Sequence, residues 1–293
     1  MVAGHVFGIS LPEELSSQDL LKPYEPFETA SQSSPLFTLR LQKVEQLRNV
    51  VSGKPLKCLN DEAPYFWIFE EEDGTYSFAF SYTKAHPDCL LKLSAASDEG
   101  VVYISERNSE RLAEFAISNA VMLMYTFCTA QYDTMMVHAS VIANNEGGYM
   151  FLGKSGTGKS THSRLWLNHI AGSELLNDDN PVIRVIDNKA IVYGTPWSGK
   201  TPCYRNVCYP LAAITRLQQA PHNSYRQLTD IEAFTAIAPS CAVITQNIAL
   251  YNNLCDRLVW VSENIVVSLL HCLPCKEAAT TALVGISESR NQK

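Results

Sequence analysis

The sequence has few charged residues, and basic residues are the scarcer kind. Charged residues make up 18% of the 293 residues, and 30 Asp and Glu outnumber 23 Lys and Arg, which gives a formal net charge of -7. This charge provides no general attraction to nucleic acid or to an anionic membrane. We therefore expect no nucleic-acid partner and no membrane partner, and the absence of any recognisable helicase motif argues against a nucleic-acid motor.

Long hydrophobic runs are also missing. The apolar runs near residues 120–128 and 263–270 are shorter than the ~18 residues that a membrane span needs. The first residues, MVAGHVFGISLPEELSS, show no basic segment followed by an apolar one, so no secretion signal is expected. Nine cysteines are an odd number without framework spacing, which fits a reducing compartment. We expect a cytoplasmic protein in which Cys272 and Cys275, despite their CxxC spacing, are packing thiols at the start of a helix.

Hydrophobic residues, at 46% of the chain, are numerous enough to form a large core without disulfides or metal. Short strand candidates and turns fill the first 105 residues, and a helical pattern follows from Ser105 to about Tyr132. Strand and helix signals then alternate to the C-terminus. We predict an α/β protein with α+β character, in which a smaller N-terminal α+β domain (residues 1–105) serves substrate docking and residues 106–293 form the catalytic domain with a leading helix.

The predicted elements can be given by residue range. Strands are expected at Leu36–Leu41, Tyr65–Phe69, Thr75–Phe80, Val101–Ile104, Val137–Ala143, Gly148–Leu152, Val182–Ile186, Ala190–Tyr193, Ala212–Leu217 and Ile265–Leu269. Further helices are expected at Lys159–Ile170, Asp230–Ile237 and Cys275–Leu283. Asp73-Gly74 and Asp187-Asn188 are the hairpin turn signals between neighbouring strands.

A glycine-rich loop after residue 152 matches the phosphate-binding pattern G-x-x-x-x-G-K-[ST]. It consists of Gly153, Lys154, Ser155, Gly156, Thr157, Gly158, Lys159 and Ser160. The loop follows an apolar strand and precedes a helix, as the mechanism requires, because backbone N–H groups and the helix N-terminus then surround the phosphates. Lys159 would reach the β- and γ-phosphates and Ser160 would ligate Mg²⁺, with Thr161 as a second candidate hydroxyl. The loop predicts binding of ATP with Mg²⁺.

An acidic pair, Asp178-Asp179, follows soon after this loop, at the end of the apolar run Leu175-Leu176. One helix and one return strand fit in the interval, which would bring both carboxylates to the mouth of the loop. One carboxylate can hold Mg²⁺ and the other can accept a hydroxyl proton. Asn-Asp-Asp-Asn-Pro is also good turn chemistry, but the upstream loop favours the functional interpretation.

A third constellation, Gly194-Thr-Pro-Trp-Ser-Gly-Lys200, is followed by Arg205. Its glycines and proline predict a tight loop, and Lys200 and Arg205 can bind phosphate or substrate. On structural grounds alone, Trp197 is a loop or core anchor and the two cations are solvated surface charges.

The run His138-Ala-Ser, the loop 153–161, Asp178-Asp179 and Gly194–Gly199 together resemble the bacterial HPr serine kinase/phosphorylase group. The closest resemblance is to its shorter relatives in peptide and cofactor pathways, over roughly residues 130–275. The resemblance implies a P-loop nucleotide-binding core of the HPr kinase/phosphoenolpyruvate carboxykinase type. It also implies that His138 lies beside the first aspartate, that Asp178 is the general base, and that Asp179 lies near the metal. The family forms oligomers, so the resemblance also implies a homo-oligomer.

We therefore predict an ATP- and Mg²⁺-dependent kinase that phosphorylates a hydroxyl, a serine of a peptide or protein, with Asp178, His138 and Lys159 as catalytic residues. Two alternatives stay open. The first is a small-metabolite kinase or carboxykinase-like enzyme, and the second is a non-catalytic ATP-binding sensor. Thr161-His162 stands where HPr kinases carry an acidic residue after the loop serine, so the sequence does not identify HPr as the acceptor.

Overall fold

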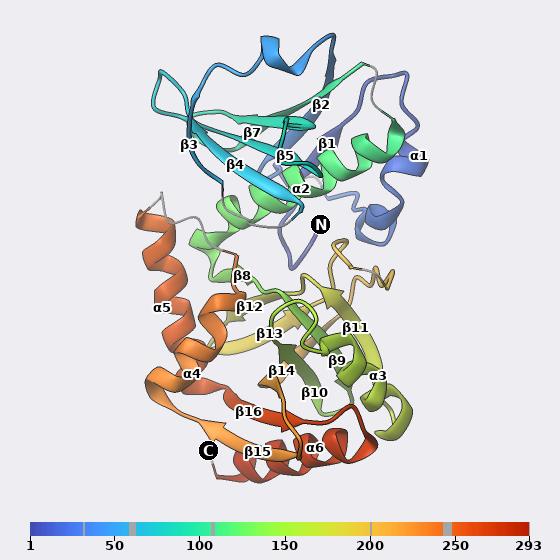
Figure 1. Cartoon of the computed structure of the whole chain (residues 1–293), viewed down its shortest axis with the longest axis vertical. Helices are drawn as coiled ribbons and strands as arrows, with labels where there is room; N and C mark the ends of the chain where they lie inside the picture. Colours follow the sequence, from blue (N-terminus) through green and yellow to red (C-terminus); the bar gives the residue numbers. More distant parts are fainter. Residues whose placement is uncertain (32, 59–62, 107–108, 200, 243–247, 293) are drawn as a thin grey trace. The chain divides into compact units, whose positions relative to one another are not determined.

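The computed structural model describes residues 1–31, 33–58, 63–106, 109–199, 201–242 and 248–292 (Figure 1). The chain forms two compact units. The first is Ala3–Cys128 together with Met1, and the second is Thr129–Lys293 together with Val2. Each unit has its own sheet system.

The N-terminal unit is built on a seven-stranded sheet with the order β1-β2-β7-β6-β5-β4-β3. Its strands are β1 (Gly8–Ser10), β2 (Thr38–Val44), β3 (Lys54–Cys58), β4 (Tyr65–Glu70), β5 (Tyr76–Ser81), β6 (Cys89–Leu93) and β7 (Glu99–Ser105). A short helix α1 (Ser17–Leu20) and the 3-10 segments η1 (Lys22–Phe27) and η2 (Leu47–Asn49) complete this unit. The predicted hairpin at Asp73-Gly74 is confirmed, because β4 and β5 pair antiparallel from Tyr65↔Ser81 to Glu70↔Tyr76.

Helix α2 (Glu110–Thr129) packs on this sheet. Phe127 meets Phe78 of β5 edge-on at 5.6 Å between ring centroids, and a Cβ added at Gly100 of β7 would collide with Met124 of α2. The unit boundary therefore falls at Cys128, one helix later than the expected boundary at residue 105. The apolar stripe that suggested a leading helix of the second unit packs instead on the first sheet.

One helix among the described residues, Glu110–Tyr132, is long and apolar enough to cross a membrane by length and composition alone. It comprises α2 and the following 3-10 turn η3 (Ala130–Tyr132). Ala116, Ile117, Ala120 and Val121 on this helix are fully buried within the protein. Such burial is typical of a helix in the core of a protein.

The C-terminal unit contains a nine-stranded sheet system. Its strands are β8 (Thr134–Met136), β9 (Ala139–Asn144), β10 (Gly147–Leu152), β11 (Glu174–Asp179), β12 (Val182–Ile186), β13 (Lys189–Tyr193), β14 (Cys208–Gln219), β15 (Ser224–Leu228) and β16 (Val266–Cys272). The long strand β14 joins two parts of the system: its first residues pair with β13, and the rest pair parallel with β10 and β16. The helices are α3 (Lys159–His169), α4 (Asp230–Ile237), α5 (Ile248–Asn264) and α6 (Lys276–Asn291), with the 3-10 turn η4 (Ala238–Ser240) after α4.

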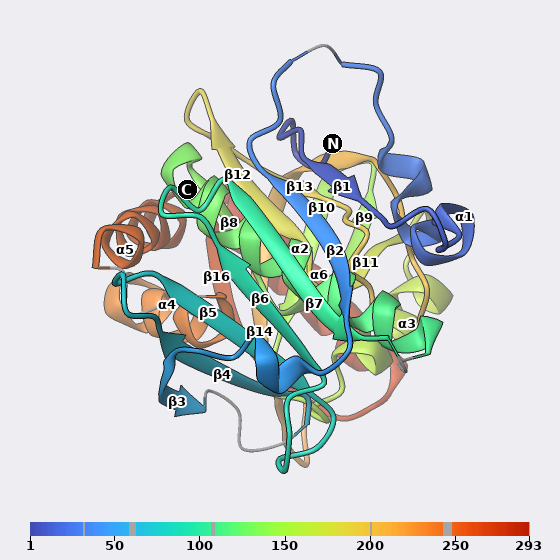
Figure 2. The same cartoon turned by 90° about the horizontal axis from the view of Figure 1, so that it is seen from above.

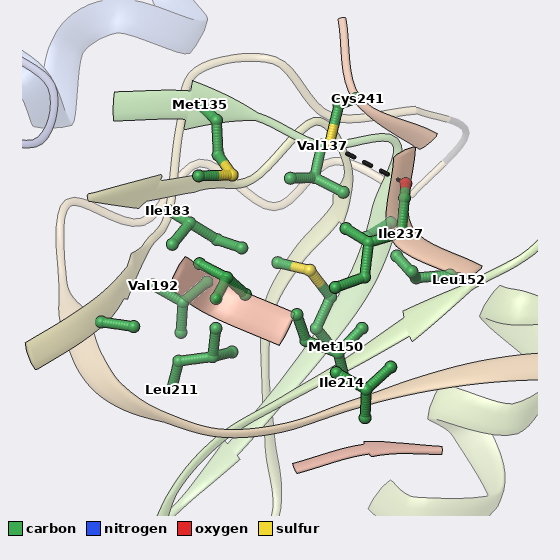
Figure 3. Packing of buried hydrophobic residues seen from close by; sticks show 14 of the residues in the cluster. Met135, Val137, Met150, Leu152, Ile183, Val192, Leu211, Ile214, Ile237 and Cys241 are labelled. Atoms are coloured by element: carbon green, nitrogen blue, oxygen red, sulfur yellow. Dashed lines mark hydrogen bonds between the residues drawn. The ribbon is translucent and has the colours of Figure 1, made fainter. Parts of the chain in front are cut away.

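Alternation along β10 assigns its side chains to two separate cores. Met150 and Leu152 belong to a cluster with residues of α4 and α5, and Figure 3 shows these two side chains with Ile214, Ile237 and Cys241. Tyr149 and Phe151 belong to a second cluster that includes Trp166 of α3 and Ala279, Ala282 and Ile286 of α6. The central strands are therefore covered on both faces, with α4 and α5 on one and α3 and α6 on the other (Figure 1).

Figure 2 views the same elements from above. Most predicted elements of the second unit are present with shifted ends: Lys159–Ile170 is α3, Asp230–Ile237 is α4, and Cys275–Leu283 lies in the longer α6. The β12–β13 hairpin is confirmed, with Asp187 and Asn188 at φ values of 48° and 57°. The α+β character of the prediction is thus confirmed. Helix α5 and strand β15 were not predicted.

Candidate functional site

Three neighbouring strands bring the predicted site residues to one edge of the sheet. Leu152, the last residue of β10, pairs with Ala139 of β9, and Ala139 pairs on its other side with Asp179 of β11. The glycine-rich loop leaves β10 at this level, His138 immediately precedes β9, and the acidic pair ends β11. The expectation that the acidic pair returns to the mouth of the loop is therefore confirmed by the register of the strands.

The loop from Gly153 to Gly158 connects β10 directly to α3. Gly156 and Gly158 have φ values of 78° and 107°, a region that residues with a Cβ atom rarely adopt. No atom lies within 4 Å of a Cβ built on either glycine, so the backbone is open to a ligand there. Helix α3 is fixed to the sheet by a buried hydrogen bond of 2.7 Å between Ser163 and Ser140 of β9.

Lys159, the first residue of α3, points back into the site. Its Nζ donates to the carbonyl oxygen of Gly153 at 2.9 Å and lies 3.1 Å from Nε2 of His138. Burial lowers the pKa of Lys159, while Asp179 and Asp178 act in the opposite direction. A buried cation beside an open glycine loop is a suitable partner for a phosphate anion.

The two aspartates have different partners and different exposure. Oδ1 of Asp178 accepts a hydrogen bond from Oγ of Ser160 at 3.1 Å, and Asp178 is 7% exposed. Oδ1 of Asp179 lies 3.2 Å from Nε2 of His138, and the side chains of His138 and Asp179 are 44% and 40% exposed. Asp179 has a φ of 154°. The structure thus joins the buried Asp178 to the exposed Ser160, and it pairs the partly exposed side chains of His138 and Asp179.

These contacts correct one part of the sequence interpretation. We expected His138 beside the first aspartate, Asp178, but His138 contacts Asp179. We also expected Ser160 and Asp179 to form the metal site together, yet Ser160 bonds to Asp178. The cause lies in β11, where the register with β9 shifts between Leu175 and Asn177. Such a bulge changes which face of the strand each later side chain occupies.

Two residues that the sequence analysis did not identify as site residues, Asn177 and Thr195, hold the acidic pair in place. Asn177 is fully buried, and its Nδ2 donates to Oγ1 of Thr195 at 3.1 Å while its Oδ1 accepts from the backbone N–H of Asn180 at 3.0 Å. Thr195 donates to the carbonyl oxygen of Asn180 at 2.8 Å. The sequence signal for Asn177 was its position directly before Asp178-Asp179, in a run that also matches a turn.

The Gly194–Gly199 segment therefore acts as a support for β11. The N–H of Gly199 donates to the carbonyl oxygen of Asp178 at 2.7 Å, and Ser198 forms an isolated bridge with Asp179. Trp197 is 3% exposed, which agrees with its interpretation as a loop anchor. Lys200 lies outside the described residues.

Arg205 is not brought to the site. Its guanidinium donates to Oε2 of Glu174 at 2.9 Å and to the carbonyl oxygen of Leu175 at 2.7 Å. Glu174 begins β11 and Asp179 ends it, so the two carboxylates are separated by roughly 16 Å of strand. Arg205 stabilises the far end of β11, away from the acidic pair.

The donor set at the loop fits Mg²⁺. The hydroxyl of Ser160 and a carboxylate oxygen of Asp178 lie 3.1 Å apart, and Mg²⁺ in phosphate-transfer sites takes one or two protein oxygens, with phosphates and waters as the remaining ligands. No group of three or more His, Cys, Asp or Glu residues suited to a metal occurs among the described residues. A dedicated transition-metal centre is therefore not indicated in that part of the chain.

Comparison with known proteins gives structural likenesses alone. No family model matches the chain, and no curated protein matches it. Among solved structures it is similar to the HPr(Ser) kinase/phosphatase from Coxiella burnetii, at 13% sequence identity and a TM-score of 0.31, over 54% of this chain and 97% of that chain. This TM-score is too low to support a functional conclusion, so function has to follow from the contacts of the site.

Proposed function

We propose that the protein is an ATP- and Mg²⁺-dependent kinase that transfers the γ-phosphoryl group of ATP to a hydroxyl acceptor. The observation that carries the proposal is a set of contacts at the end of an open glycine loop: Ser160 bonds to Asp178, and Lys159 lies beside His138, which contacts Asp179. Phosphoryl transfer depends mainly on positioning and on stabilisation of charge, and these residue types supply both.

Burial divides the work between the two carboxylates. Asp178 is covered and bonded to the loop serine, so with Ser160 it would hold Mg²⁺, which when bound neutralises charge on the phosphates. Asp179 is open to solvent beside His138, so an acceptor hydroxyl can reach it. The family resemblance implied Asp178 as the base, whereas the contacts of the site support Asp179 in that role.

Nε2 of His138 lies between a cation and an anion, 3.1 Å from Nζ of Lys159 and 3.2 Å from Oδ1 of Asp179. With a proton on Nε2, the ring can donate to Asp179, and without it the nitrogen can accept from Lys159. His138 is thus suited to hold a proton close to Asp179 during transfer. Because the side chains of His138 and Asp179 are open to solvent, the acceptor would approach from their side.

The acceptor class proposed first is a serine of a peptide or protein, in a cytoplasmic enzyme. All nine cysteines are free thiols, which supports a reducing compartment. The experiment is incubation of the protein with Mg²⁺, γ-labelled ATP and a lysate of its source. Asp179→Asn is the inactive variant, and Glu174→Gln, a carboxylate of the same strand away from the loop, is the matched control.

A labelled protein or peptide that disappears with Asp179→Asn and persists with Glu174→Gln would support the proposal. Label on a small molecule would replace the serine acceptor with a metabolite. Binding of ATP with no labelled product would contradict the kinase and favour an ATP-binding sensor.

A further inference from the structure

A hollow opens beside the phosphate loop, away from the carboxylates. It has a volume of about 380 Å³ and is lined by Gly156, Thr157, Gly158, Thr161, His162, Leu165, Gln219, Ala220, Cys272, Leu273 and Pro274. This volume falls in the range of roughly 300–1,000 Å³ that small-molecule sites occupy. None of the residues assigned to phosphoryl transfer lines it. The hollow is therefore continuous with the loop but separate from the reacting end.

The geometry of α3 sets the two sides of the loop apart. At about 100° per residue, Thr161, His162 and Leu165 lie between about 100° and 200° around the helix from Ser160. Ser160 bonds to Asp178, so the three lining residues lie on the side of α3 that faces away from the transfer chemistry. A nucleotide whose γ-phosphate reaches Lys159 must place its nucleoside on some other side of the loop.

The far wall of the hollow is preformed. Cys272 ends β16 opposite Gln219 of β14, and the following turn is held by Asn223. Its Oδ1 accepts from the N–H of Leu273 at 2.9 Å, and its Nδ2 contacts Sγ of Cys275 at 3.3 Å. Gln219 donates to the carbonyl oxygens of Gly156 and Thr157 at 3.4 and 3.3 Å, which ties this wall to the phosphate loop.

The lining is mainly apolar and uncharged. Its hydrophobic surface comes from Leu165, Ala220, Leu273 and Pro274. Leu273 is a large apolar side chain that is 40% exposed. His162 of α3 also lines the hollow. Nε2 of this ring accepts from Trp166 at 3.0 Å, and Nδ1 has no hydrogen-bond partner among the described residues. A mainly apolar, uncharged lining is typical of small-molecule sites, and it suits the faces of a flat heteroaromatic ring.

We propose that this hollow, the base pocket, holds the nucleobase of the phosphoryl donor, so that the donor is a nucleoside triphosphate and not pyrophosphate. The inference rests on the proposed function for the position of the phosphates on the loop. Leu165, Ala220 and Leu273 are then specificity residues that contact the base, and Gln219 is a positioning residue that joins the pocket to the loop.

The test compares Mg²⁺-ATP with Mg²⁺-pyrophosphate by calorimetry. Leu273→Ser removes an apolar wall, and Ala220→Trp fills the pocket. Leu167→Ser is the matched control, because Leu167 lies on α3 with a similar exposure of 38% and does not line the pocket. We expect the Kd for ATP to rise about tenfold with Leu273→Ser and further with Ala220→Trp. The Kd for pyrophosphate should stay unchanged, and Leu167→Ser should change neither.

Thermal unfolding of each variant checks that the fold is retained, and cysteine labelling gives a readout in the unmodified protein. A nonhydrolysable ATP analogue should slow alkylation of Cys272, while the exposed thiol of Cys208 keeps its rate and pyrophosphate protects neither. Equal Kd values for ATP and pyrophosphate, or equal weakening of both by Leu273→Ser, would overturn the base pocket and leave the kinase standing. Tight ATP binding through this pocket without transfer to any acceptor would instead overturn the kinase alone.

Discussion

Strand β11 carries carboxylates at both of its ends, and the two ends differ in how those charges are balanced. Glu174, at the start, is paired with Arg205 and is also hydrogen-bonded by Tyr209. Asp178 and Asp179, at the other end, are bonded to a serine and a histidine beside an open glycine loop. A carboxylate neutralised by arginine supports the fold. Carboxylates that face a hydroxyl, an imidazole and an open glycine loop can take part in chemistry.

Removing the positive charge of Lys159, beside the end of β11 that meets the glycine loop, should have the largest effect on phosphoryl transfer. Lys159→Met keeps the length of the side chain but removes the charge that would contact the phosphates. We expect phosphoryl transfer to fall by about 10³-fold, measured as the initial rate with γ-labelled ATP. A rate within threefold of the unmodified protein would show that the loop end of β11 is not the reacting end.

Asn177, within β11 next to the acidic pair, tests how strongly that pair is supported. Asn177→Ala leaves Thr195 and the N–H of Asn180 without their buried partner, which should lower the free energy of unfolding by about 3 kcal/mol. Urea denaturation measures the change, and an unaltered slope with denaturant would show that the native fold is retained. A loss below about 0.5 kcal/mol, the size of an ordinary surface change, would contradict the support role.

His138 distinguishes a proton-holding role from a structural one at the loop end. His138→Gln keeps a polar side chain but cannot hold a proton, so the transfer rate should fall on the order of 10²-fold. Added imidazole should restore part of the lost rate. A lower rate that imidazole does not restore would contradict proton transfer and leave His138 a positioning residue.

The smallest effect is expected at the start of β11. Hydrogen bonds from Tyr209 and Arg205 lower the pKa of Glu174 from its ordinary 4.5, so this group stabilises the fold above pH 4.5 and loses that contribution as the pH falls through its folded pKa. Glu174→Gln should cost about 1 kcal/mol at pH 7, because the pair is partly exposed. The difference should close in acid, and phosphoryl transfer should be unchanged. A large loss of phosphoryl transfer with Glu174→Gln would contradict the proposed difference between the two ends of β11.

The sequence predicted the position of the site better than its contacts. The glycine loop, the acidic pair and the strands that carry them follow from short patterns, and the register of β9 with β10 and β11 confirms their meeting. The contact partners of the two aspartates could not be predicted, because the residue pattern of β11 gives no sign of its register shift. Arg205 pairs with a glutamate distant in sequence, which no local pattern indicates.

Helix α5 shows why one element of the fold was missed. Asn252 and Asn253 lie in its interior, and asparagine favours caps and turns over helix interiors. Leu258 and Val261 of α5 are buried in the core that includes α4 and β16. Tertiary packing therefore stabilises this helix against a weak local preference.

The most direct measurement is the rate of phosphoryl transfer as a function of Mg²⁺ concentration for Asp178→Asn and Asp179→Asn, with Glu174→Gln as the reference. The account predicts that Asp178→Asn shifts the curve to higher Mg²⁺ concentrations, because it weakens the Ser160–Asp178 site. It predicts that Asp179→Asn lowers the plateau by at least about 10² without a shift. A fully active Asp179→Asn variant together with an Asp178→Asn variant that loses transfer at unchanged Mg²⁺ dependence would contradict it.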